Sequence, residues 1–155
     1  WDLCDHLCRN LFLKMKGRDT FITNWIQGAQ LYKKRAAFVL IAGSVIHDKK
    51  LPDETVDGYL ELIMQYSDDE REHVKKAASS ALKEIGKKNF HYNEEALMLA
   101  HEWMERGSKA QRWIGKDVVK ELETMVKAEG RRRLISANTR MGKETMEEQS
   151  TGGSG

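Results

Sequence analysis

Hydrophobic residues recur along this chain at the three- and four-residue spacing that gathers side chains on one face of a helix. The first such stretch runs from about residue 2 to residue 15 and ends before Gly17. The second runs from Phe21 to His47, with a candidate break at Gln27 and Gly28. Its later part, from Ala36 to Ile46, is apolar nearly all round, which is typical of a helix in the centre of a core.

Four more helices follow from the same periodicity and from residues that begin or end helices. Pro52 is suited to a first turn, and the stretch after it stays periodic to about Tyr66. The next helix ends at Gly86, and the one after it is capped by Asn93 and ends near Arg106. A last helix is predicted from Lys109 to Ala128, with order doubtful beyond Gly130. The candidate N-caps of the helix that ends at Gly86 are Ser67, Asp68 and Asp69.

A weak repeat links three of the helices, because a basic residue opens an apolar or Ala-rich helix at Arg35, Lys76 and Arg112, at intervals of 41 and 36 residues. These intervals fit stacked helical pairs of the HEAT type. The sequence therefore predicts an all-α fold, a HEAT-like α-solenoid of antiparallel helix pairs over residues 1–134. The alternative is an irregular helical bundle without a true repeat. Residues 135–155, which end in STGGSG, are expected to form a flexible tail that includes linker-like residues.

Composition narrows the class of protein. The chain has 155 residues, of which 40% are hydrophobic and 32% charged, with a single proline. These values exclude a disordered chain, and no apolar run reaches the length of a membrane span. Although the net charge is only +2, residues 1–50 hold nine basic and four acidic residues, so the positive charge gathers at that end. Cys4 and Cys8 are four residues apart in a helical pattern, a poor geometry for a disulfide, so we expect a cytoplasmic protein.

Common enzyme signatures are absent: no GxxxxGK loop, HExxH, CxxC pair or GxSxG elbow occurs. Cys4, His6 and Cys8 lack the further ligands that a metal site needs, so we interpret the cysteines as packing residues. Trp1 and Asp5 are four residues apart and therefore lie on one face of a helix.

The segments WDLCDHLCRNLF, YKKRAAFVLIAGSVIHDKK, DDEREHVKKAASSALKEIGKKN and AQRWIGKDVVKEL follow one another in this order. They resemble consecutive segments of the AlkD family of DNA alkylation repair glycosylases, from Trp1 to about Leu134. The family is an all-helical HEAT-like solenoid, and the resemblance implies that the part N-terminal to Trp1 is missing here. It also implies a function, which is excision of N3- and N7-alkylated purines from duplex DNA without metal or cofactor. The implied partner is duplex DNA containing alkylated bases, and the implied location is the cytoplasm, at the nucleoid when DNA is bound.

The resemblance implies roles for individual residues. Asp5 would stabilise an oxocarbenium-like sugar, Trp1 would lie against the sugar or the cationic base, and Arg35 would hold a phosphate. Lys34, Lys76 and Arg112 are the further candidates for phosphate binding. Without the resemblance, Trp1 could be a core aromatic, Asp5 a helix-start charge, and the basic run at residues 33–35 a solvated face. A wider set of basic residues could line a concave DNA-facing surface with Arg35, namely Lys75, Lys83, Lys87, Lys88, Lys109 and Lys116.

One position departs from the family pattern. Ser80 stands where the family commonly has a second tryptophan, so one aromatic wall of the lesion cleft is missing. Either the activity is altered, or another aromatic such as Trp25 supplies the contact. A non-catalytic HEAT-like module that binds DNA or protein is the alternative function. Trp103 and Trp113 fall on apolar stripes and are interpreted as core residues.

Overall fold

A computed structural model describes residues 18–28, 30–48, 51–127 and 133–136, with the single positions 144 and 147. This part of the chain is built of helices, which confirms the predicted all-α class. They are α2 (Arg18–Ile26), α3 (Leu31–His47), α4 (Asp53–Tyr66), α5 (Glu72–Gly86), α6 (Phe90–Arg106) and α7 (Lys109–Leu122). Two short strands follow, β1 (Met125–Val126) and β2 (Ile135–Ser136), which pair antiparallel.

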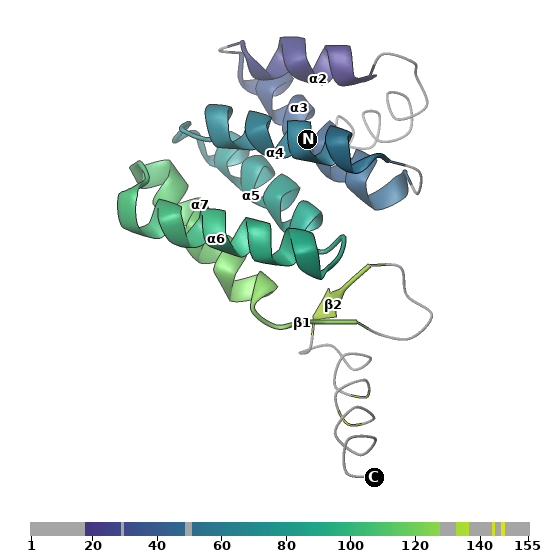
Figure 1. The fold of residues 1–155 in the computed structure, drawn as a ribbon. Coiled ribbons are helices and arrows are strands. Elements are labelled where there is room, and N and C mark those ends of the chain that lie inside the picture. The colour runs from purple at the N-terminus through teal and green to yellow at the C-terminus, as the bar shows by residue number, and fades with distance from the viewer. Residues whose placement is uncertain are drawn as a thin grey trace.

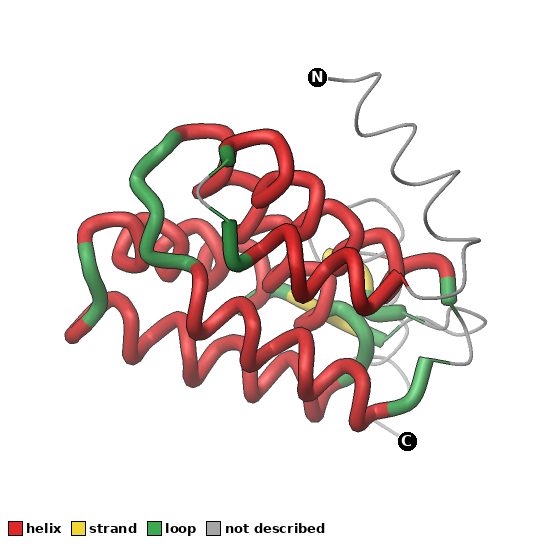
Figure 2. Tube along the Cα trace, turned by 90° about the horizontal axis from the view of Figure 1, so that it is seen from above, coloured by secondary structure: helices red, strands yellow, loops and turns green. Residues whose placement is uncertain are grey.

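The helices form two layers. Helices α2, α4 and α6 lie in front of α3, α5 and α7 in Figure 1, and Figure 2 shows loops gathered at the two ends of the helices. Successive helices pack as pairs, α2 on α3, α4 on α5 and α6 on α7, and the second layer is continuous because α5 contacts both α3 and α7. This stacking of helix pairs is the solenoid-like arrangement that the repeat predicted.

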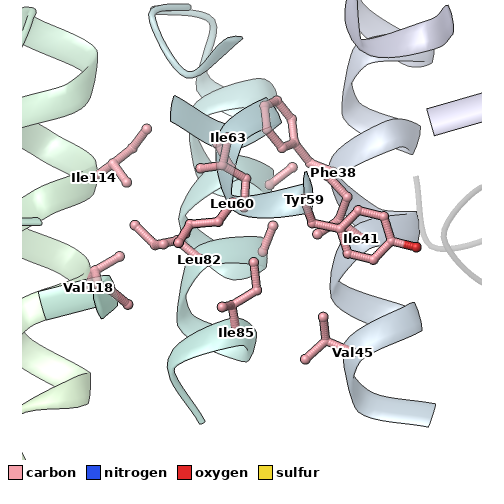
Figure 3. Close-up of a cluster of buried hydrophobic side chains, with 14 of the residues drawn as sticks. Phe38, Ile41, Val45, Tyr59, Leu60, Ile63, Leu82, Ile85, Ile114 and Val118 are labelled. Atoms are coloured by element: carbon pink, nitrogen blue, oxygen red, sulfur yellow. The ribbon is translucent and has the colours of Figure 1, made fainter. Parts of the chain in front are cut away.

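The core lies between the two layers. In Figure 3, Phe38, Ile41 and Val45 of α3 face side chains of α4 and α5, and Ile114 and Val118 of α7 approach α5 from the other side. The nearly all-apolar part of α3 is buried as predicted, because α2, α4 and α5 each contact this helix. The predicted break is also confirmed, since α2 ends at Ile26 and α3 begins at Leu31.

The N-caps predicted for two helices, α5 and α6, are wrong. Helix α5 begins at Glu72 after Arg71, with no side-chain cap, because Asp69 instead accepts hydrogen bonds from the Arg71 guanidinium. Helix α6 begins three residues before the predicted cap, at Phe90, and Asn89 caps it by accepting from the backbone N–H of Tyr92. Asn93 is buried inside α6, where its amide donates to the carbonyl of Leu122 at 3.1 Å. An asparagine that reaches a carbonyl at the end of another helix is satisfied without capping its own.

The C-terminal strap, Arg133–Ser136, lies beyond Gly130, in the region where the sequence left order in doubt. Helix α7 ends at Leu122, before the predicted end at residue 128, and Met125–Val126 pairs with Ile135–Ser136. Leu134 is buried, and its backbone N–H donates to the carbonyl of Lys87 at 2.8 Å. The strap therefore joins the end of α5 to the segment after α7.

Arg133 fastens the strap to two helix ends. Its guanidinium donates to the carbonyl of Val45 at 3.1 Å, and to the carbonyl and carboxylate of Glu84 at 2.6 and 2.7 Å. One cation thus donates to carbonyls in the last turns of both α3 and α5.

Replacing Arg133 with alanine is expected to lower the free energy of unfolding by about 2 kcal/mol, because partly buried acceptors lose a charged donor. Urea unfolding of the two proteins measures the difference. Arg106→Ala, at the exposed end of α6, is the matched control and should change the value by less than about 0.5 kcal/mol. Equal losses in the two variants would contradict the role of the strap.

Candidate nucleic-acid interface

A pocket of about 200 Å³ lies between α3 and α5 and brings together Arg35, Lys76 and Ser80. We name it the Arg35 pocket. Its other lining residues are Val39, Ala42, His73 and Ala77. The periodicity of the helices explains the set, because α3 contributes positions 35, 39 and 42 and α5 contributes positions 73, 76, 77 and 80. Two of the residues predicted to bind phosphate therefore meet in one groove.

The two cations of the Arg35 pocket differ in their surroundings. Arg35 is half-buried on α3, whereas Lys76 is exposed and forms an ion pair with Glu72 one turn earlier, with Nζ 3.2 Å from the carboxylate. That ion pair lowers the pKa of Glu72. An exposed pair of this kind is weak, so the ammonium of Lys76 can exchange Glu72 for a phosphate at little cost.

Lys34 lies elsewhere, in an ion pair with Asp69 in the loop before α5. Its Nζ is 3.2 Å from the carboxylate, and both side chains are largely buried. Hydrogen bonds from the Arg71 side chain hold the pKa of Asp69 well below its usual range, and Lys34 adds to the effect. The charge of Lys34, one of the four residues predicted to bind phosphate, is thus met by a largely buried carboxylate of the protein.

The fourth predicted residue, Arg112, lines a second pocket in the next groove, between α5 and α7. This pocket, which we name the Trp113 pocket, has a volume of about 390 Å³. It is lined by Glu70, Lys75, Lys109, Ala110, Arg112, Trp113 and Lys116. Trp113 is half-buried, so its interpretation as a plain core residue is incomplete, whereas Trp103 is buried as predicted.

The repeat explains why these residues occupy successive grooves. Arg35, Lys76 and Arg112 lie near the beginnings of α3, α5 and α7, the three helices of one layer. Equivalent positions of stacked repeats fall along one side of the stack. The sequence signal therefore located a basic row, although the separation into two pockets appears only in the structure.

A polar cluster joins α5 to α7 beside the two pockets. Asp117 accepts hydrogen bonds from the Ser79 hydroxyl at 2.5 Å and from the Lys83 ammonium at 3.0 Å. Partial burial alone would raise the pKa of Asp117, but the hydrogen bonds from Ser79 and Lys83 outweigh it, and the pKa is lowered. The cluster therefore favours the ionised carboxylate in the folded protein.

This shift predicts a loss of stability in acid. A carboxylate whose pKa is lowered by folding stabilises the fold at pH values above its pKa in the unfolded chain, which is about 3.9. This contribution disappears as the pH falls through the lower pKa of the folded protein. Asp117→Asn should lower the free energy of unfolding at pH 7 by about 1 kcal/mol, allowing for solvent screening, and the difference should shrink below pH 4. Urea unfolding at several pH values measures this. The exposed Asp68→Asn is the control, and a difference that is independent of pH would contradict the assignment.

The remaining residues considered in the sequence analysis have different outcomes in the structure. Trp1 and Asp5 lie outside the described residues. Trp25, the suggested substitute for the missing aromatic, packs on α2 against the core and does not line the Arg35 pocket. His73 does line that pocket and was not assigned from the sequence. Its spacing of three and seven residues from Lys76 and Ser80 is the signal that could have found it.

Within the described ranges, no group of three acidic, cysteine or histidine side chains is placed to hold a metal ion. None of the helices in the described part of the chain is long and apolar enough to cross a bilayer.

In the described part of the chain, stacked helix pairs and two neighbouring grooves lined by basic residues define a solenoid-like helical protein. The family model described as DNA alkylation repair enzyme matches residues 1–121, and the chain belongs to that family. No curated protein and no solved structure matches the chain.

Proposed function

We propose that this protein is a DNA glycosylase that excises N3- and N7-alkylated purines from duplex DNA. The observation that carries the proposal is the family match over residues 1–121, which includes Trp1, Asp5 and the helices of both pockets. Membership of the family supports a role in DNA repair, and the arrangement of Arg35 and Lys76 in one groove supports a phosphate contact.

The proposed reaction needs a cationic leaving group, a carboxylate beside the sugar and a water molecule. An N3- or N7-alkylated purine carries a positive charge, so the bond between C1′ and the base nitrogen breaks with both electrons going to the base. The sugar becomes oxocarbenium-like, and a carboxylate beside it stabilises the developing charge. Water then adds to C1′ and loses a proton, which leaves a free alkylpurine and an abasic site. No cofactor enters this balance.

Asp5 is the proposed carboxylate, and it could also orient the attacking water. Trp1, four residues earlier in the sequence, would contact the sugar or the cationic base, and such a contact contributes about 0.5 to 2 kcal/mol. Arg35 would hold a backbone phosphate with its planar guanidinium, which can donate two parallel hydrogen bonds and so fix the register of the DNA. Lys76 lies in the same pocket and Arg112 in the next, so the contacts would follow the strand.

Arg35→Gln is expected to weaken duplex binding by about tenfold in 100 mM salt, because one charged phosphate contact is lost. The slope of log affinity against log salt should become shallower by about one contact. Fluorescence anisotropy of a labelled duplex measures both quantities. Arg106→Gln, an exposed charge in the other layer, is the control and should leave them nearly unchanged. An unchanged slope in Arg35→Gln would remove Arg35 from the interface.

The second candidate function is a non-catalytic module that binds DNA or protein, and Ser80 favours it. Ser80 is exposed and lines the Arg35 pocket, whose described lining contains no tryptophan, tyrosine or phenylalanine. A pocket lining without one of these aromatic rings offers a base a poor surface on which to stack. Incubation with a methylated duplex separates the two functions: release of free alkylpurine supports the glycosylase, whereas intact binding without release supports the module.

A further inference from the structure

We propose that the Trp113 pocket is a separate nucleotide site, which takes one unpaired nucleotide of DNA with its base against the Trp113 indole and its phosphate on Arg112 and Lys116. The inference rests on the proposed function only in taking DNA as the ligand. It concerns binding and requires no excision.

The charge of the pocket favours an anion. One face of α7 presents Lys109, Arg112, Trp113 and Lys116, which follow the helical spacing of three, four and seven residues. Lys109, Arg112 and Lys116 are exposed, and no carboxylate of the described residues lies within ion-pair distance of them. Lys75 adds a fourth cation from α5, opposed by Glu70 in the pocket and by Glu72, whose carboxylate is 3.7 Å from its ammonium. These four basic side chains outnumber the two carboxylates, so the pocket has a net positive charge.

The indole indicates that the ligand is more than a phosphate. Trp113 packs in part against the core, and the Lys75 ammonium lies 4.7 Å from the centre of its ring. These two contacts restrict the ring before any ligand arrives, and a base that stacks on the face covered by Lys75 has to displace that ammonium. A fixed aromatic ring among cations is the combination with which proteins bind single-stranded nucleic acid, where stacking contributes about 1–3 kcal/mol per base. The volume of about 390 Å³ lies within the range of small-ligand sites.

The position of the pocket connects it to the proposed DNA path. Helix α5 separates it from the Arg35 pocket, and the adjacent residues Lys75 and Lys76 line one pocket each. Packed helices lie about 8–10 Å apart, so the two grooves are separated by a distance that a few nucleotides span. A strand held at Arg35 and Lys76 can therefore place a neighbouring unpaired nucleotide against Trp113.

The test compares two single-stranded probes of equal length on the folded full chain. One is an oligothymidylate, and the other carries the same phosphates on abasic sugar units. We expect the oligothymidylate to bind at least tenfold more tightly, because only it has bases to stack. Equal affinities would overturn the proposal and leave a purely electrostatic surface.

Variants of the lining residues test whether the difference in affinity between the two probes arises in the Trp113 pocket. Trp113→Leu keeps an apolar side chain for the core contact but removes the ring, and it should abolish the preference for the base-containing probe while leaving abasic binding unchanged. Trp113→Phe should retain most of the preference. Arg112→Gln should weaken the binding of both probes by a similar factor, whereas Arg106→Gln should leave both affinities unchanged. A preference that survives in Trp113→Leu would overturn the proposal. Because no lesion is used, a negative result here is independent of whether the protein excises alkylpurines.

Discussion

Asp5→Asn is expected to slow the release of free alkylpurine at least a hundredfold while leaving the affinity for duplex DNA within about threefold of the original. The amide has the size of the carboxylate but lacks its charge. It therefore cannot stabilise the positive charge that develops on the sugar as the glycosidic bond breaks. Losing one preorganised electrostatic contact of this kind typically costs a factor of about 100 to 1,000 in rate. Single-turnover excision with the protein in excess measures the chemical step directly.

Asp2→Asn is the matched control, since it removes the same charge three residues earlier in the chain. Its excision rate should remain within a few fold of the original. An Asp5→Asn protein that excises at the original rate would remove Asp5 from the mechanism. A parallel loss of binding and excision in Asp5→Asn would instead assign Asp5 to the docking of DNA.

Gly115→Ala should lower the free energy of unfolding by about 1–3 kcal/mol. An added methyl group would lie 2.5 Å from the carbonyl oxygen of Ala100 and 3.0 Å from Cγ of Met104. The first of these atoms belongs to the backbone of α6, so α6 and α7 would have to separate. Because the two helices form one of the pairs of the fold, the strain cannot be relieved by moving a side chain alone.

Gly58→Ala is the control for this effect. Gly58 lies in the middle of α4, and a methyl group there would meet no atom within 4 Å. Alanine is favoured over glycine in a helix by about 0.5–1 kcal/mol, so this variant should be as stable as the original or more stable. Thermal and urea unfolding should therefore show a loss of stability for Gly115→Ala and none for Gly58→Ala. Destabilisation of the same size at both positions would contradict the close approach of α6 and α7.

The features that the sequence predicts well are those carried by local pattern. The nearly all-apolar run from Ala36 to Ile46 can only lie in a core, and it does. The basic residues at positions 35, 76 and 112 predicted a repeat, and they occupy similar places in the three helices of one layer. Ser108, the residue before the predicted start of the last helix at Lys109, forms a full capping box with Gln111.

The features that the sequence predicts poorly depend on contacts between distant segments. Asn93 has the properties of a cap, but its partner is a carbonyl 29 residues away at the end of α7. Arg133 lies where the sequence leaves order in doubt, yet it has partners 49 and 88 residues earlier in the chain. Trp113 falls on an apolar stripe, and only the placement of α5 beside α7 shows that cations surround it. Trp1 and Asp5 were selected by resemblance to a family, because nothing in their spacing alone distinguishes them from structural residues.

The measurement that tests the glycosylase proposal most directly is the yield of products from a duplex methylated at purine N3 and N7. Free bases are counted by chromatography, and abasic sites in the DNA are counted in the same samples over time. A glycosylase yields free alkylpurine and abasic sites in equal amounts, and both should increase with the concentration of the protein. Duplex that is bound with salt-sensitive affinity but yields neither product would contradict the proposal. So would methyl groups lost from bases that remain attached to the DNA.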